Sequence, residues 1–164
     1  MPELRVLGID PGLVGTGWAV VEPGPGGVSV IDSGVIATAA GLPLEVRVQL
    51  IYDGVDLVLR TQAPSLVVLE DLYAEYRFPR TALLMAHARG VICLAARQRA
   101  VTLLALAPAE VKRAIAANGA ASKAQIQTGV QRRLGLAVAP RSSHVADALA
   151  LALTGLSRRG GRRT

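Results

Sequence analysis

Three acidic residues stand in apolar surroundings, where an isolated carboxylate is costly to bury. Asp10 follows the apolar segment Leu4–Ile9, Glu70 ends the run SLVVLE, and Asp147 interrupts the nearly uncharged stretch VADALALALTGL. A buried carboxylate needs a cation, a hydrogen-bond donor or a proton to offset its lost hydration. Taken alone, Asp10 is typical of a turn and Glu70 of a solvated loop. Taken together, the three acids suggest an oxygen-rich site for Mg²⁺ or Mn²⁺, with purely structural roles as the alternative.

His144 is a further potential ligand beside Asp147. The two residues are three positions apart, so on a helix they share one face. Ser142 or Ser143 can cap a helix that starts there. A lone histidine in this position is more often a helix-end partner than a ligand. Two potential ligands on one turn of an apolar helix are a more specific signal than either alone.

The elements that position these side chains follow from the periodicity of the apolar residues. We predict strands over Leu4–Ile9, Thr16–Val21, Val28–Thr38, Ser65–Glu70 and Val101–Ala107. We predict helices over Leu44–Gln62, Thr81–Arg99 with Thr81 as its cap, Pro108 to just before Gly119, Lys123–Leu134 and Ser142–Leu156.

The order of these elements predicts an α/β fold. Three strands joined by short turns form an antiparallel meander, and the later strands alternate with helices. The result is a mixed five-stranded sheet flanked by helices. Asp10 and Glu70 each end a strand, so parallel pairing of those strands would bring them to the edge where open α/β sheets bind ligands.

Length and composition bound the other possibilities. A chain of 164 residues predicts one domain, residues 1–156, followed by a flexible basic tail, residues 157–164. The single cysteine, Cys93, excludes an internal disulfide and a cysteine zinc cage, and it fits a cytoplasmic location. A hydrophobic share of 51% excludes a disordered chain. We find no secretory signal and no membrane span.

The net charge of +6 and the isoelectric point near 10.4 indicate a polyanionic partner such as nucleic acid. Four arginines of the final SRRGGRRT account for most of this excess and leave +2 for the rest. Composition alone therefore supports nucleic-acid binding only weakly, and a solvated tail is the alternative.

Four segments together resemble the RuvC family of Holliday junction resolvases. They are GIDPGLVGTGWAVV (Gly8–Val21), VVLEDLY (Val67–Tyr73), LAPAEVKRAIAANGAASKAQIQTGV (Leu106–Val130) and PRSSHVADALALALT (Pro140–Thr154). The resemblance implies an RNase H-like fold and a metal-dependent endodeoxyribonuclease of recombination and DNA repair. Its substrate would be four-way junction DNA. Symmetric nicks in two like-oriented strands would leave 5′-phosphate and 3′-hydroxyl ends.

The same resemblance assigns ligands to the site. Asp10, Glu70 and Asp147 match the family's acids, and His144 falls where members carry either aspartate or histidine. Two ions about 4 Å apart would serve phosphodiester hydrolysis. Asp10 would bridge them, Glu70 would hold the ion near the leaving 3′ oxygen, and Asp147 with His144 would hold the ion that activates water. Because imidazole is a poorer ligand for Mg²⁺ than carboxylate, we expect a tilt toward Mn²⁺.

Further residues are assigned to DNA by the resemblance. Lys112 and Lys123 match lysines near the scissile phosphate, although either could simply decorate a helix surface. Tyr73 falls where the family places an aromatic that meets unpaired bases. Arg77 lies in the same loop and is a further candidate for DNA binding. Tyr76 and Phe78 are also in this loop, and packing of Phe78 onto the body of the protein is the alternative.

The resemblance also implies a homodimer and a branch-migration helicase as partners, with no membrane. The candidate dimer surface is the helix Thr81–Arg99, through Leu83, Leu84, Met85, Val91 and Ile92, although such a stripe could equally be core.

Three other functions compete with this hypothesis. A nuclease of the same fold could process structured ribosomal RNA, although the contexts of Glu70 and Lys123 favour the resolvases. An ATP-binding fold of the actin and sugar-kinase type would need a second half that 164 residues do not accommodate. A non-catalytic junction-binding module would not need acids at three apolar positions.

Overall fold

Five strands form one mixed sheet in the computed structural model, which describes residues 4–72 and 78–161. The strands are β1 (Val6–Asp10), β2 (Gly15–Gly24), β3 (Gly27–Ala37), β4 (Leu66–Glu70) and β5 (Thr102–Leu106). Their order across the sheet is β3-β2-β1-β4-β5. β1, β2 and β3 pair antiparallel, whereas β4 lies parallel to both β1 and β5. The predicted fold class is confirmed.

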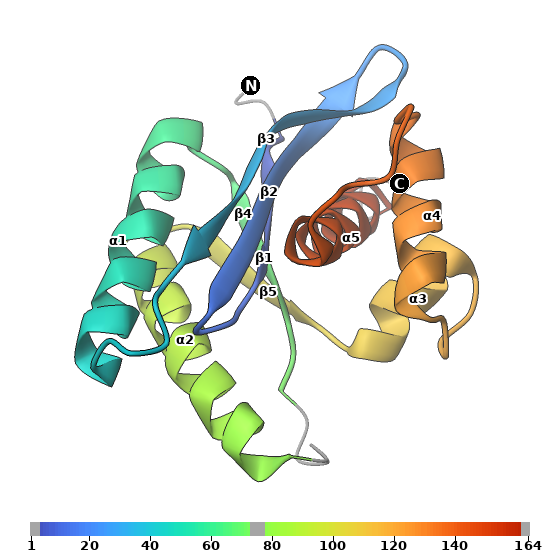
Figure 1. Ribbon diagram of the computed structural model, residues 1–164. Helices are drawn as coiled ribbons and strands as arrows, with labels where there is room; N and C mark the ends of the chain where they lie inside the picture. The colour runs from blue at the N-terminus through green and yellow to red at the C-terminus, as the bar shows by residue number, and fades with distance from the viewer. Residues whose placement is uncertain (1–3, 73–77, 162–164) are drawn as a thin grey trace.

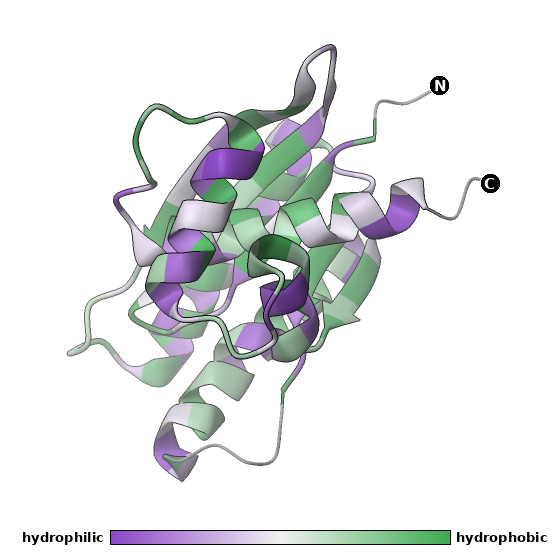
Figure 2. Cartoon of the chain, turned by 90° about the vertical axis from the view of Figure 1, so that its right-hand side faces the viewer, coloured by the Kyte–Doolittle hydropathy of each residue, from purple (hydrophilic) through white to green (hydrophobic). Residues whose placement is uncertain are grey.

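Five helices cover the two faces of this sheet (Figure 1). They are α1 (Leu44–Gln62), α2 (Pro79–Gln98), α3 (Pro108–Ala116), α4 (Lys123–Leu134) and α5 (Ser143–Gly160). α1 and α2 lie on one face, and α5 lies on the other with α3 and α4 beside it. Apolar strands run through the middle of the molecule, and the more hydrophilic segments lie toward its outside (Figure 2).

The alternation of side chains along β1 decides which face its last residue points to. Leu7 and Ile9 belong to the core under α1 and α2, whereas Val6 belongs to the core under α5. Successive side chains of a strand point to opposite faces, so Asp10 shares the α5 face with Val6. The same alternation along β4 places Glu70 on that face with Leu66 and Val68.

α5 lies unusually close to the sheet because glycine and alanine line the contact. A Cβ on Gly8 of β1 would lie 2.1 Å from the carbonyl oxygen of Ala148, and one on Gly17 of β2 would lie 2.2 Å from that of His144. Toward the other end of the helix, a Cβ on Gly155 would lie 2.4 Å from Val68. Larger residues at these positions would push α5 off the sheet.

Several element boundaries differ from the sequence-based expectation, and two of them concern α2 and α5. Thr81 is not the cap of α2: the helix begins at Pro79 with Phe78 as N-cap, because proline fits the first helical position without losing a hydrogen bond. α5 continues past Leu156, so residues 157–160 are helical. Arg158 pairs with Glu110 at 3.2 Å and Arg159 donates to the carbonyl oxygen of Ser65, and these contacts anchor the last turn.

Within the described ranges, no helix is long and apolar enough to cross a membrane.

Candidate active site

Three carboxylates meet at one edge of the sheet. Asp10 ends β1 and Glu70 ends β4, and the preceding residues, Ile9 and Leu69, are register partners in the parallel pair. The two acids are therefore neighbours on the face that α5 covers. Asp147 lies in the first turns of α5, the helix that crosses β1 at this end.

His144 contacts Asp10 directly. Its Nδ1 lies 3.3 Å from Oδ2 of Asp10 and donates a hydrogen bond there in the tautomer protonated at Nδ1. Ser142 accepts a hydrogen bond from the backbone N–H of Val145, so the predicted serine cap starts α5 directly before His144. The imidazole stays 46% exposed, whereas the Asp10 side chain is only 21% exposed.

Burial raises the pKa values of all three acids. Burial, with the negative charge of Asp147, raises the pKa of Asp10 from 3.8 to about 6, against the opposing effects of His144 and Lys123. Burial, with the charges of Asp10 and Asp147, raises the pKa of Glu70 from 4.5 to about 7, against the effect of Lys112. Burial also raises the pKa of Asp147. Paired carboxylates with displaced pKa values are typical of catalytic sites.

Two lysines face these acids across a cleft. A cavity of about 430 Å³ lies between α3, α4 and α5, and its lining includes Glu70, Asp147, Lys112 and Lys123. Lys112 comes from α3 and Lys123 from the first position of α4. The structure therefore brings all six residues predicted for catalysis to one region, with the two lysines lining the same cleft as Glu70 and Asp147.

A second, smaller cavity of about 130 Å³ opens on the other side of the acidic pair, with Asp10, Glu70 and Met85 in its lining. Arg89 of α2 also lines it, donates a hydrogen bond to the backbone carbonyl of Glu70 at 3.3 Å and pairs with Asp71 at 3.8 Å. Sequence reasoning missed Arg89. The available signal was a charged residue within a largely apolar helix.

The four predicted ligands do not form a compact cluster among the described residues. In residues 4–72 and 78–161, no group of three or more His, Cys, Asp or Glu side chains is arranged to hold one. The assignment of Asp10, Glu70, His144 and Asp147 as metal ligands therefore stays a prediction. Mutual repulsion between carboxylates opposes their closer approach unless a cation offsets it. The donor types, three carboxylates and an imidazole, do fit a divalent cation.

The predicted DNA-contacting loop is only partly described. Tyr73, Tyr76 and Arg77 lie outside the described residues. Phe78 is described and is 66% exposed at the start of α2, so it is not packed into the core.

The candidate dimer stripe on α2 divides into two parts. Leu83 and Leu84 are exposed, whereas Ile92 is fully buried and Val91 packs against the core. Leu94 adds a further exposed leucine on this helix.

Comparison with known proteins gives consistent matches over nearly the whole chain. Residues 6–155 match the sequence model of the family described as crossover junction endodeoxyribonuclease RuvC. A RuvC of Rhodopirellula baltica is 42% identical over 150 residues, which cover 92% of this chain and 84% of that protein. A RuvC of Fusobacterium nucleatum is 36% identical over 97% of this chain and 83% of its own length.

Solved structures of resolvases are similar to this chain over nearly its whole length. Thermus thermophilus RuvC in complex with a Holliday junction substrate superposes with a TM-score of 0.88 at 36% identity, covering 96% of each chain. The yeast mitochondrial Holliday junction resolvase superposes with a TM-score of 0.69 over 98% of this chain and 80% of its own, and at 16% identity it supports the fold alone.

Proposed function

This chain belongs to the RuvC family of crossover junction endodeoxyribonucleases, and on that premise we propose how it resolves Holliday junctions. The fold is the RNase H-like mixed sheet of these resolvases. One observation supports the proposal above the others: Asp10, Glu70, Asp147, His144 and two lysines occupy a single edge of the sheet. This combination of metal ligands and phosphate-binding cations suits phosphodiester cleavage.

RuvC nucleases depend on metal ions. When bound, divalent cations at such a site make water easier to deprotonate and neutralise charge on the leaving oxygen. Asp10, Glu70, Asp147 and His144 would hold two ions. The imidazole favours Mn²⁺ over Mg²⁺ because it is a softer ligand than a carboxylate.

The chain's own residues position the substrate. Lys112 and Lys123 line the cleft and would bind non-bridging oxygens of the scissile phosphate. The contact between His144 and Asp10 would help to orient both side chains. Arg89 fixes the end of β4 through the Glu70 carbonyl, so that the glutamate side chain leaves the sheet at a defined place.

Resolution needs two nicks, and a two-fold dimer would supply two sites. The exposed leucines of α2, at positions 83, 84 and 94, are the proposed contact between two copies. The loop with Tyr73 and Arg77 is proposed to contact bases at the exchange point. We further propose a branch-migration helicase as partner and the cytoplasm as location, which a single cysteine fits.

The decisive experiment offers the protein a synthetic four-way junction, a linear duplex of matching sequence and a structured RNA, each with Mg²⁺ or Mn²⁺. We expect symmetric nicks confined to the junction. Asp147→Asn should abolish nicking and preserve junction binding, because it removes one negative charge from a site that faces phosphate. Asp53→Asn makes the same change on exposed α1, across the sheet from the site, and should cut normally.

Cleavage of the RNA in place of the junction would favour the processing function. Binding without any cleavage in either metal would favour the non-catalytic module. An Asp147→Asn variant that loses binding together with cleavage would contradict the role assigned to Asp147.

A further inference from the structure

The excess positive charge is concentrated in one stretch of the chain. Between Glu110 and Asp147 there is no acidic residue, and there are six basic ones: Lys112, Arg113, Lys123, Arg132, Arg133 and Arg141. The whole chain has 18 basic and 12 acidic residues, so the other 12 basic residues equal the acidic ones in number. This stretch therefore carries a charge of +6, equal to the net charge of the whole chain, while the remaining residues, with the four terminal arginines among them, sum to zero.

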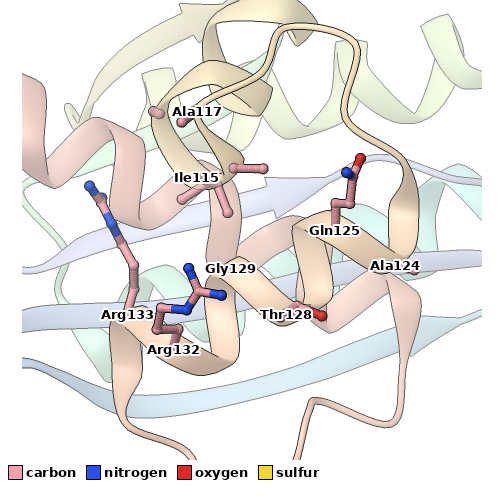
Figure 3. A pocket seen from close by; sticks show the side chains of 10 residues that line it. Ile115, Ala117, Ala124, Gln125, Thr128, Gly129, Arg132 and Arg133 are labelled. Atoms are coloured by element: carbon pink, nitrogen blue, oxygen red, sulfur yellow. The ribbon is translucent and has the colours of Figure 1, made fainter.

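The two lysines of this stretch belong to the cleft already described, but Arg132 and Arg133 do not. They lie in the last turn of α4 and line a separate groove of about 530 Å³ between α3 and α4. Figure 3 shows both arginine side chains extending from α4 toward the α3 side of this groove, with Gln125 and Thr128 on the same helix. No carboxylate of the described residues pairs with either guanidinium.

One helix thus connects the groove to the catalytic cleft. Lys123 begins α4 at the cleft, and Arg132 follows nine positions later, about 13.5 Å along the helix axis at 1.5 Å per residue. A DNA strand rises about 3.4 Å per nucleotide, so this distance corresponds to about four nucleotides. The chemistry of the groove fits a phosphodiester backbone: two guanidinium groups, a hydroxyl and an amide on the α4 side.

We propose that the α3–α4 groove is a second phosphate-binding site, which holds a junction arm about four nucleotides from the scissile phosphate. The proposal rests on the proposed junction-cleaving function and adds a contact outside its catalytic site. The C-terminal carbonyls of α3 line the opposite wall, so the phosphate contacts come from Arg132 and Arg133 of α4. The contact is to backbone, so it adds affinity without sequence preference.

The test compares junction binding by the wild type and by Arg132→Gln/Arg133→Gln across a salt series, with binding measured in Ca²⁺ to prevent cleavage. Each phosphate contact contributes about 0.9 to the slope of log affinity against log salt. Losing two contacts should lower the slope by about 1.8. Between 50 and 200 mM salt, wild-type affinity should therefore fall roughly tenfold more than that of the variant. Nicking of saturated complexes should be unchanged.

Two controls separate the groove from general charge. Arg132→Lys/Arg133→Lys keeps both charges and should retain most of the slope. Arg60→Gln removes one positive charge from α1, on the opposite face of the sheet, and should leave junction binding unchanged. The wild type should bind more weakly to a junction that carries neutral methylphosphonates three to five nucleotides from the cut, on either side. Binding of this junction by the glutamine variant should change little.

An unchanged salt slope in the glutamine variant would overturn the proposal. Arg132 and Arg133 would then only stabilise the partial negative charge at the C-terminus of α4, and the variant would show a lower melting temperature with normal DNA binding. If the wild type itself neither binds nor cuts junctions, the proposed function fails. If the wild type cuts them and the variant binds equally well, only the groove assignment fails.

Discussion

Replacing Gly17 with alanine should show how much activity depends on the position of α5, because it moves the helix without changing any residue on it. Gly17 is the register partner of Asp10, and α5 crosses β2 at this point. A Cβ on Gly17 would lie 2.2 Å from the carbonyl oxygen of His144 and 2.4 Å from its carbonyl carbon. Backbone atoms cannot rotate away, so the start of α5 must move.

The size of the movement follows from these distances. Cβ atoms essentially never approach a neighbour within 3.0 Å, so α5 must retreat by at least the difference from 2.2 Å, about 0.8 Å. Overpacking of this kind costs about 1–3 kcal/mol, which lowers the melting temperature of a chain this size by roughly 2–12 °C. A misplacement near 1 Å at a catalytic group costs about a hundredfold in rate. We therefore expect a folded protein with nicking slowed about a hundredfold.

The assay is single-turnover nicking of a four-way junction at saturating protein, well below the melting temperature of the variant. Gly26→Ala is the matched control, since a Cβ there meets nothing within 4 Å, and it should match the wild type in rate. If Gly17→Ala stays folded and nicks within about threefold of the wild type, the close docking of α5 does not position His144 and Asp147.

Three further predictions concern stability. Without metal, Glu70→Gln should gain stability relative to the wild type as pH rises from about 4.5 to about 7, because only the wild type must ionise a buried carboxyl whose pKa burial and Asp10 raise. Urea unfolding at several pH values measures this, and a constant difference between the two proteins would contradict it. Asp56→Asn should destabilise the folded protein at pH 7 and have no effect well below pH 3.8, because the hydrogen bond from Arg99 lowers the pKa of Asp56. Equal melting temperatures of variant and wild type at pH 7 would refute this prediction. Ile92→Ala should lower the unfolding free energy by about 2–5 kcal/mol in urea titrations, since Ile92 is fully buried, and a loss under 1 kcal/mol would place it outside the core.

Local signals predicted the elements well where the chain carries explicit boundary residues. The bounds of α4 agree with the prediction because Ser122 and Gln125 form a reciprocal capping box and Gly135 ends the helix with a φ of +61°. The start of α2 was misplaced because Thr81 resembles a cap, whereas Pro79 fixes the first turn two residues earlier.

The candidate site was predictable in its location but not in its contacts. Strand ends and helix periodicity place Asp10, Glu70 and Asp147 at one edge of the sheet. The hydrogen bond from Arg89 to the end of β4 joins segments 19 residues apart, and no spacing rule reports such a contact. The glycine at position 17 shows no sign in its sequence context that a helix carbonyl lies against it.

The charge distribution also affects how the molecule meets DNA. Acidic and basic residues are equal in number outside the stretch between Glu110 and Asp147, so the surplus of positive charge lies on the segment that forms α3 and α4. In the field of a polyanion such a body rotates during diffusion, and its basic side arrives first. Because the catalytic cleft opens beside α3 and α4, productive orientation begins before any contact forms.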